Sequence, residues 1–325
     1  MTVSVKDVAA AAGVSAGTVS NALNHPERVA PETVERVRRA IRDLGYVRND
    51  AARQLRAGRS RSVGLIVLDM RNPFYADVAR GADARAEQDG LSVLVSDSAR
   101  DGERERRLVA LFAEQRASGV IATPLTGDLE HFERLAERGV PVVLVDHEGD
   151  SDGLSTVSVD DRKGGRLATE HLLARGCTRI AFVGGPSGLR QVRDRFEGAR
   201  AAASAAGAAL ERVEIDDLTV RHGRAAGEAL LRRPTGRRPD GIFAANDLVA
   251  VGLLQALTMT GGVRVPDDIA LVGYDDIDFA ASTVVPLTSV RQPAELLGAT
   301  AIELLAQEPG EHVRFEPQVV VRATA

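Results

Sequence analysis

The chain opens with two short apolar stripes whose spacing predicts a pair of helices. The first stripe repeats at i, i+3, i+4 and i+7, which is one face of a helix, and consists of Val5, Val8, Ala9 and Ala12. Ser4 and Asp7 stand three residues apart at its start, as in a capping box. Gly13 follows and suits the left-handed backbone of a tight turn. We therefore expect a short capped helix that ends at this glycine.

A second short helix is predicted directly after the turn. Ser15 is placed to cap it, and its apolar positions face the same core as the first stripe; they are Val19, Ala22 and Leu23. Two short helices joined by a glycine-containing turn form a helix-turn-helix, whose second helix is shaped to enter the DNA major groove.

The outward face of this second helix favours DNA binding over an ordinary helical hairpin. Its side chains are small or able to form hydrogen bonds: Ser15, Ala16, Gly17, Ser20 and Asn21. A helix that merely faced solvent would more often carry Lys and Glu. With Ala16 and Gly17 at outward positions, the sequence does not indicate which operator half-site is read.

A third helix from 31 to 44 completes a small N-terminal unit. Pro31 suits the first turn of a helix and Gly45 suits the stop. The buried stripe of this helix is expected to contain Val34, Val37, Ile41 and Leu44. Its four arginines, at 36, 38, 39 and 42, are interpreted as a solvated face.

From Val63 onward the pattern changes to alternating strands and helices. Apolar runs of strand length lie at 63–68, 91–95, 120–122, 140–145, 180–183, 241–245 and 269–272. Helical stretches lie between them at 75–89, 104–117, 164–176, 195–207, 224–232 and 248–259. This alternation predicts an α/β fold of parallel sheets with helices on both faces. The stretch is longer than one such sheet requires, so we expect two similar lobes.

Length and composition agree with a soluble protein of two or three domains. The chain has 325 residues, of which 44% are hydrophobic, and no run is long enough to span a membrane. The N-terminus has no apolar signal-peptide core. Cys177 is the single cysteine, so no internal disulfide is possible, which suits a reducing compartment. We expect a cytoplasmic protein without a membrane partner.

The net charge of −5 hides an asymmetry along the chain. Residues 1–60 contain ten Lys and Arg against six Asp and Glu, while the remainder contains 31 against 40. A basic N-terminal unit on an acidic body suits contact with phosphates at one end only.

Polar residues stand at or near the carboxyl ends of the predicted strands. They are Asp69, Asp97, Thr123, Asp146, Asp160, Asn246 and Asp275. In open α/β sheets the ligand crevice lies outside these ends. Carboxylate and amide groups pair well with hydroxyls, so the set indicates a crevice for a polyhydroxylated ligand.

Signatures of enzymes and metal sites are missing from the sequence. No G-x-G-x-x-G follows a strand and no Walker loop is present, so a nucleotide cofactor lacks support. The six histidines are isolated and Cys177 has no ligand partners, which argues against zinc. The acidic run 275–278 is interpreted as a ligand-facing residue followed by a turn. We predict no catalytic residues, no cofactor and no metal.

Residues 5–24, VKDVAAAAGVSAGTVSNALN, resemble the N-terminal signature of the LacI/GalR family of bacterial repressors, and the similarity extends over essentially the whole chain. The resemblance implies a DNA-binding domain at 1–48, a hinge helix and linker at 49–61, and a two-lobed effector-binding and dimerisation domain at 62–325, like a periplasmic binding protein. It also implies that 293–307 crosses back to the first lobe. The implied DNA contacts of the helix-turn-helix are Ser15, Ala16, Gly17, Thr18, Ser20, Asn21 and Asn24.

The segment 49–56, NDAARQLR, resembles the family's hinge helix, which folds when the dimer sits on its operator. Leu55 matches the leucine that wedges into the central minor groove, where an apolar side chain kinks the duplex. Arg53 is a further implied DNA contact. The family usually has Pro before the hinge Asn, and this chain has Arg48 there.

The resemblance also assigns the effector site. The implied contacts, with Thr123 and Gln191 the weaker matches, are Phe74, Tyr75, Thr123, Asp146, Gln191, Arg195, Leu218, Asn246 and Asp275. Leu218 stands where several relatives have an aromatic residue, and the chain has no Trp. Stacking on a sugar then falls to Phe74, Tyr75 or Phe279. Without ligand, Arg195 and Asp275 are expected to be paired with water or with each other.

The sequence thus predicts a homodimeric, ligand-controlled transcriptional regulator that binds palindromic double-stranded operator DNA. The main hypothesis is a repressor of sugar-utilisation genes with a sugar or polyol as effector. A non-sugar effector, such as a nucleobase corepressor, remains open, and so does the choice between induction and corepression. A solute-binding protein would need a signal peptide and no DNA-binding unit. A sugar-processing enzyme is the remaining alternative.

Overall fold

The computed structural model describes residues 3–46, 60–148, 153–259 and 262–325. The chain forms two compact units, Met1–Ser60 and Arg61–Ala325. The hinge residues Arg48, Arg53 and Leu55 lie outside the described residues. No helix in the described ranges is both long enough and apolar enough to cross a membrane.

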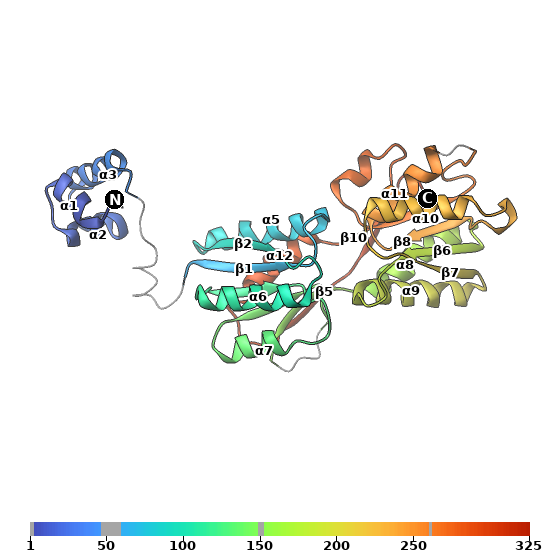
Figure 1. Ribbon diagram of the computed structural model, residues 1–325, viewed down its shortest axis with the longest axis horizontal. Helices are drawn as coiled ribbons and strands as arrows, with labels where there is room; N and C mark the ends of the chain where they lie inside the picture. Colours follow the sequence, from blue (N-terminus) through green and yellow to red (C-terminus); the bar gives the residue numbers. More distant parts are fainter. Residues whose placement is uncertain (1–2, 47–59, 149–152, 260–261) are drawn as a thin grey trace. The chain divides into compact units, whose positions relative to one another are not determined.

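The first unit is the predicted small helical bundle (Figure 1). It contains α1 (Val5–Ala12), α2 (Ala16–Asn24), a 3-10 turn η1 (Pro26–Arg28) and α3 (Pro31–Leu44). The capping box is present, because the Ser4 hydroxyl accepts from the backbone N–H of Asp7 and the Asp7 carboxylate accepts from that of Ser4. Gly13 has φ 64° and ends α1. The three helices pack around Val8, Val19 and Val37, which are fully buried.

The second unit contains two α/β lobes, as the alternating pattern predicted. In the first lobe, six parallel strands pair in the order β11-β5-β4-β3-β1-β2. The strands are β1 (Ser62–Val67), β2 (Ser92–Asp97), β3 (Gly119–Ala122), β4 (Val142–Val145), β5 (Ser155–Val159) and β11 (His312–Phe315). Its helices are α5 (Pro73–Gln88), α6 (Gly102–Glu114), α7 (Glu130–Glu137) and α12 (Ala294–Leu304).

The second lobe has the strand order β12-β10-β9-β8-β6-β7, and β12 alone is antiparallel to its neighbour among these paired strands. The strands are β6 (Arg179–Gly184), β7 (Ala209–Glu214), β8 (Gly241–Ala244), β9 (Ala270–Asp275), β10 (Thr288–Arg291) and β12 (Gln318–Val320). The helices are α8 (Asp161–Ala174), α9 (Arg190–Ala206), α10 (Val220–Leu231) and α11 (Asp247–Met259), with 3-10 turns η2 (Thr235–Arg237) and η3 (Asp278–Ser282).

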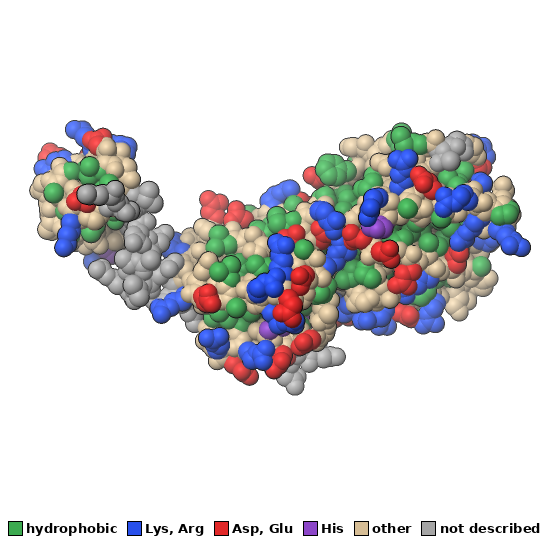
Figure 2. All heavy atoms as spheres, viewed as in Figure 1, with side chains coloured by type: hydrophobic (Ala, Val, Ile, Leu, Met, Phe, Trp, Pro, Cys, Tyr) green, Lys and Arg blue, Asp and Glu red, His purple; other side chains and the backbone are tan. Residues whose placement is uncertain are grey.

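The chain passes between the lobes three times: from β5 into α8, from β10 into α12 and from β11 into β12 (Figure 1). The second crossing confirms the expectation that 293–307 returns to the first lobe, since Leu297 and Ala301 of α12 belong to that lobe's core. Charged side chains of both signs are interspersed on the face of the second unit drawn in Figure 2.

Three helix pairs in the second unit approach so closely that only glycine fits at their contacts. A Cβ on Gly165 of α8 would lie 1.9 Å from the carbonyl oxygen of Arg195 on α9, and a Cβ on Gly198 of α9 would lie 1.9 Å from that of Arg162. Reciprocal glycines also join α5 to α12 and α10 to α11; these are Gly81 with Gly298 and Gly223 with Gly252. The contact between α8 and α9 matters for function because it brings the first turns of both helices together.

Gly165→Ala is expected to destabilise the second unit, because the added methyl group collides with backbone that a rotamer change cannot move. Overpacking of this kind costs about 1–3 kcal/mol. Gly102→Ala is the matched control: Gly102 also lies in a helix, but the nearest atoms to its Cβ position are 3.9 Å away. Chemical denaturation followed by circular dichroism should show a loss for Gly165→Ala alone. Equal unfolding free energies for both variants would contradict the glycine contact.

Candidate functional site

The exposed face of α2 has the small polar surface that the sequence predicted. Ser15 caps the helix by accepting from the Thr18 N–H at 3.0 Å, and the two hydroxyls lie 2.9 Å apart. The Asn24 side chain donates to the Ser20 carbonyl at 2.9 Å. Ala16, Gly17 and Asn21 are exposed.

A cavity of about 50 Å³ lies between the two lobes, at the carboxyl ends of their central strands. The first lobe lines it with Leu68, Asp69, Asn72, Phe74, Tyr75, Arg100 and Asp146. The second lobe lines it with Leu189, Gln191, Val192, Arg195, Leu218, Asn246 and Asp275, and Gln292 joins them from the crossing into α12. The structure thus brings together every effector residue expected from the sequence except Thr123.

Thr123 lies just after β3, where it is buried and its N–H donates to the carbonyl of Ile66 on β1. Asp97 and Asp160 also stand at strand ends without lining the cavity. Phe279, a candidate for stacking, is 61% exposed on η3 and does not line the cavity either. A strand-end position is therefore not sufficient to place a side chain in the cavity, since even Thr123, at the end of the central strand β3, does not line it.

Arg195 is buried on the first turns of α9 and is held by three groups. Its Nε donates to Asp161 at 2.7 Å and its Nη1 to the Ala245 carbonyl at 2.8 Å. The guanidinium also lies 3.7 Å from the ring centre of Tyr274. Burial lowers the pKa of Arg195, but Asp161 and other anionic neighbours outweigh this and raise it above its ordinary value. Arg195 therefore remains a cation in the cavity.

Arg195 and Asp275 form the expected ion pair, with Nη1 and Oδ1 3.8 Å apart. The shorter contact of the guanidinium is with Asp161, which the sequence did not predict. Asp161 is the first residue of α8, and sequence reasoning missed it because the adjacent Asp160 looked like the strand-end residue. Asp160 instead caps α8 by accepting from the Lys163 N–H at 2.8 Å. The double carboxylate at 160–161 was the available signal.

Asp275 ends β9 with φ 106°, an uncommon backbone conformation for a residue with a side chain. Its two carboxylate oxygens each accept from an amide: Asn72 Nδ2 at 2.9 Å and Gln292 Nε2 at 2.8 Å. Asn72 belongs to the first lobe, where its other side-chain atom caps α5 through the Phe74 N–H. This hydrogen bond therefore ties the two lobes together across the cavity.

Asp146 forms the corresponding link from the first lobe. It follows β4 with φ 57°, and Gln191 of the second lobe donates to its Oδ2 at 2.6 Å. Its Oδ1 is buried and has no hydrogen-bond partner among the described residues. Burial raises the pKa of Asp146 to about 7, and the nearby Asp161 carboxylate adds to the rise. The carboxyl group can therefore accept or donate a hydrogen bond near neutral pH.

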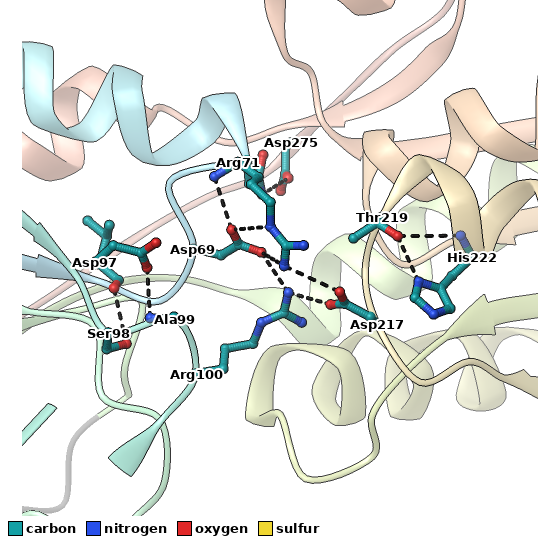
Figure 3. Close-up of polar contacts among 12 residues, drawn as sticks. Asp69, Arg71, Asp97, Ser98, Ala99, Arg100, Asp217, Thr219, His222 and Asp275 are labelled. Atoms are coloured by element: carbon teal, nitrogen blue, oxygen red, sulfur yellow. Dashed lines mark hydrogen bonds and ion pairs between the residues drawn. The ribbon is translucent and has the colours of Figure 1, made fainter. Parts of the chain in front are cut away.

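A four-residue ionic cluster closes one side of the cavity, and Figure 3 shows its members converging from both lobes. Arg71 and Arg100 donate to Asp69 at 2.7 and 2.6 Å. Both guanidiniums also contact Asp217 of the second lobe. Arg100 has φ 57°, next to Ala99 with φ 52°. Only Asp69 was singled out from the sequence, because the other three lie in loops without a periodic signal.

The charges and size of the cavity restrict its ligands. Among the residues that line the cavity, three carboxylates, of Asp69, Asp146 and Asp275, face two guanidiniums, of Arg100 and Arg195. The acidic excess disfavours an anionic ligand. The present volume holds a few water molecules and is smaller than the roughly 150 Å³ that accommodates benzene. A sugar therefore requires the lobes to separate or the bridging side chains to turn aside.

Apolar side chains supply the remaining walls. Phe74 and Tyr75 meet edge to face with ring centres 5.1 Å apart, and both are buried. Leu218 lies on the second-lobe wall. In the described ranges, no group of three or more His, Cys, Asp or Glu is arranged to hold a metal ion.

Comparisons with known proteins agree with this architecture. Residues 4–49 match the model for bacterial regulatory proteins of the lacI family, and residues 169–325 match a periplasmic binding protein-like domain. The HTH-type transcriptional regulator CelR of Thermobifida fusca is 37% identical over 97% of this chain and 96% of its own length. The ribose operon repressor of Escherichia coli K12 is 35% identical over 93% and 91%. A crystal structure of the lac repressor dimer bound to operator and the anti-inducer ONPF superposes with a TM-score of 0.84 at 30% identity, covering 100% of this chain and 99% of that one.

Asp146→Asn is expected to change how stability depends on pH. The folded-state pKa of about 7 lies above the ordinary value of 3.8, so the native state retains a proton that the unfolded chain releases. Stability is therefore lost as pH rises between these two values. The uncharged amide of Asn removes that loss. The free energy of unfolding of the variant at pH 8 should therefore exceed that of wild type by an amount on the order of 1–4 kcal/mol, because one pKa unit corresponds to about 1.4 kcal/mol.

The measurement is urea unfolding of wild type and variant at pH 5 and pH 8. Asp97→Asn serves as the control, since it makes the same chemical change at a strand end outside the cavity. A stabilisation by Asp146→Asn that is equal at both pH values would contradict the assignment of a raised pKa to this carboxyl group.

Proposed function

The chain belongs to the LacI family of bacterial regulatory proteins, so it is a DNA-binding transcriptional regulator and not an enzyme, and we propose that it is a homodimeric repressor of sugar-utilisation genes controlled by a polyhydroxylated effector bound between its lobes. In this proposal residues 1–48 bind the operator, 49–61 form the hinge, and 62–325 bind the effector and dimerise. The ribose operon repressor among the relatives supports the choice of regulated genes.

The observation that carries the effector proposal is the pair of carboxylates bridged across the lobes by amides. Asp275 is held by Asn72 and Asp146 by Gln191. Hydroxyl groups donate and accept hydrogen bonds as amides do, so a polyol can replace both bridges without leaving a carboxylate unpaired. The effector would then occupy the position at which the two lobes now contact each other directly.

A neutral sugar or polyol fits the charge of the site better than a phosphorylated one. The carboxylates outnumber the guanidiniums around the cavity, and Arg195 is already neutralised by Asp161 at 2.7 Å. An added phosphate would therefore meet more negative than positive charge. The solved relative described as a CelR–cellobiose complex, at a TM-score of 0.73 and 34% identity, is consistent with a sugar ligand.

A planar nucleobase is the second candidate effector. The apolar walls formed by Leu68, Val192 and Leu218 suit a flat ring. A thermal-shift screen of sugars, polyols and nucleobases separates the two classes, because a ligand that binds only the native state raises its apparent stability.

We expect the hydrogen bonds between the lobes, from Asn72 to Asp275 and from Gln191 to Asp146, to couple effector binding to DNA binding. A ligand that replaces them changes the preferred angle between the lobes, and a ligand shifts such an equilibrium only by its difference in affinity for the two states. The direction of the shift decides whether the effector releases the operator or tightens the hold on it. The same residues serve in either case.

Surface features of the second unit support dimerisation. β2 is the edge strand of its sheet, and Leu94 and Val95 on it are 42% and 38% exposed. An exposed apolar edge strand of this kind favours association with another chain. A dimer also matches a palindromic operator, in which each half-site receives one helix-turn-helix.

The proposal that α2 reads the operator is supported by Gly17. Glycine within a helix is about 1 kcal/mol less favourable than alanine, yet a Cβ at this position would meet only the Ser15 Oγ, at an ordinary 3.6 Å. The fold of the unit therefore gives no reason for glycine here. Close approach of the helix backbone to DNA does give one.

Gly17→Ala should make the N-terminal unit more stable by about 0.5–1 kcal/mol and at the same time weaken specific operator binding. Affinity for random DNA should change little, since it depends on phosphate charge. Ala11→Ser, on the exposed face of α1, is the control. Thermal unfolding and gel-shift titration supply the measurements, and an unchanged operator affinity would contradict a role for Gly17 at the base edges.

Arg195→Ala should weaken binding of the effector found in the screen while leaving ligand-free operator affinity nearly intact. Loss of one partner of a desolvated charged hydrogen bond costs roughly 2–5 kcal/mol, which is about two orders of magnitude in affinity or more. Arg200→Ala, an exposed arginine on the same helix, is the control. If calorimetry finds the same effector affinity in Arg195→Ala and wild type, the proposed site is wrong.

A further inference from the structure

The second unit contains another hollow, in which basic side chains outnumber acidic ones, whereas acidic side chains outnumber basic ones in the effector cavity. It is a groove of about 490 Å³ between the two lobes, lined by β5 and β11 of the first lobe and by α8 and α9 of the second. No residue that lines it also lines the effector cavity. Its charged side chains are Glu148, Arg162, Arg190, Arg193, Asp194 and Arg314.

Different faces of α9 line the groove and the effector cavity. Residues 190, 193 and 194 follow the i, i+3, i+4 spacing of one helix face and line the groove. Residues 191, 192 and 195 line the effector cavity. A ligand in the groove therefore touches the same helix turn that carries Gln191 and Arg195.

The arginines of the groove are incompletely neutralised. Glu148 is shared by Arg190 at 3.6 Å and Arg314 at 3.5 Å. Asp194 is likewise shared, by Arg190 at 3.4 Å and Arg162 at 3.2 Å. These contacts are longer than the 2.7–2.9 Å of a strong charge-assisted hydrogen bond.

Two further observations show unused hydrogen-bond donors. Arg193 is exposed and has no ion pair among the described residues. The Nε of Arg190 is buried without an acceptor in the same part of the chain, which is unfavourable unless a ligand or water supplies one. Even when Asp160, 3.7 Å from Arg314, is counted, four guanidiniums exceed three carboxylates.

We infer that this groove binds the phosphoryl group of a small phosphorylated metabolite. Guanidinium groups pair with phosphate through two parallel hydrogen bonds and cannot lose their charge. Arg314 comes from the first lobe and Arg190 and Arg193 come from the second. A phosphate between them joins the lobes, so it stabilises the arrangement in which Gln191 reaches Asp146. The metabolite is thereby coupled to the neutral effector in the other cavity.

The test is calorimetry on the full-length protein in a chloride buffer free of phosphate and sulfate, at constant ionic strength. The probes are glucose 6-phosphate, inorganic phosphate and unphosphorylated glucose. We expect saturable binding of glucose 6-phosphate in wild type and equally in Arg195→Ala, whose effector cavity is damaged. Binding of inorganic phosphate as well would show that the phosphoryl group alone is recognised; binding of the sugar phosphate only would assign part of the affinity to the sugar.

Variants that remove either basic or acidic side chains from the groove should change phosphate binding in opposite directions. The double variant Arg193→Gln/Arg314→Gln should weaken binding by about tenfold or more, as expected for charged hydrogen bonds, and both side chains are exposed enough to leave the core intact. Glu148→Gln should strengthen it, because it removes the shared carboxylate. Arg200→Gln on the same helix is the matched control and should change nothing.

Three outcomes would overturn the inference. They are an absence of saturable binding of either phosphorylated probe to wild type, an equal loss in Arg200→Gln, and a loss confined to Arg195→Ala. The last would place the ligand in the effector cavity and leave the proposed regulator function untouched.

Discussion

The buried ion pair between Arg195 and Asp161 is the interaction on which the cavity between the lobes, our proposed effector site, depends. A buried guanidinium without a partner costs several kcal/mol, and here the short bond to Asp161 provides that partner inside the second lobe. The pair forms because Gly165 and Gly198 let α8 and α9 approach until a Cβ on either would overlap the other's backbone. Backbone packing thus fixes a cation at the mouth of the lobe before any ligand arrives.

Because Arg195 has its short hydrogen bond to Asp161 within its own lobe, the hydrogen bonds that we describe between the lobes across the cavity are donated by uncharged amides. Asn72 and Gln191 are neutral amides that donate to Asp275 and Asp146, and such bonds contribute less than buried ion pairs. A ligand can therefore displace them without leaving a buried charge unpaired. The cluster of Asp69, Arg71, Arg100 and Asp217 adds a charged link at the edge of the cavity, where Arg71 is 62% exposed and solvent can replace its contacts.

The sequence predicts the architecture well where a periodic pattern has a single physical cause. The capped helices of the first unit and the central buried strands follow this rule, and the α/β fold class is confirmed. The strands β7 and β11 were missed because they lie at sheet edges, where half-exposed charged residues such as Arg212 and Arg314 break the apolar run. β5 was missed for another reason: its serines and threonine are buried yet polar. Asp161, Asn72 and Asp217 escaped notice because their roles depend on partners far away in the chain, and a single sequence contains no record of those distances.

The groove and the effector cavity of the second unit differ in net charge, and α9 lines both. Its first turns present Arg190, Arg193 and Asp194 to a basic groove and Gln191 and Arg195 to an acidic cavity. A rigid helix cannot move one face without moving the other, so an anion that fixes the first set of side chains also fixes the second. The reciprocal contact with α8 extends this coupling to Asp161. If the two proposed ligands bind as we infer, each changes the angle between the lobes through the same helix, and the opposite net charges of the two sites keep the ligands apart.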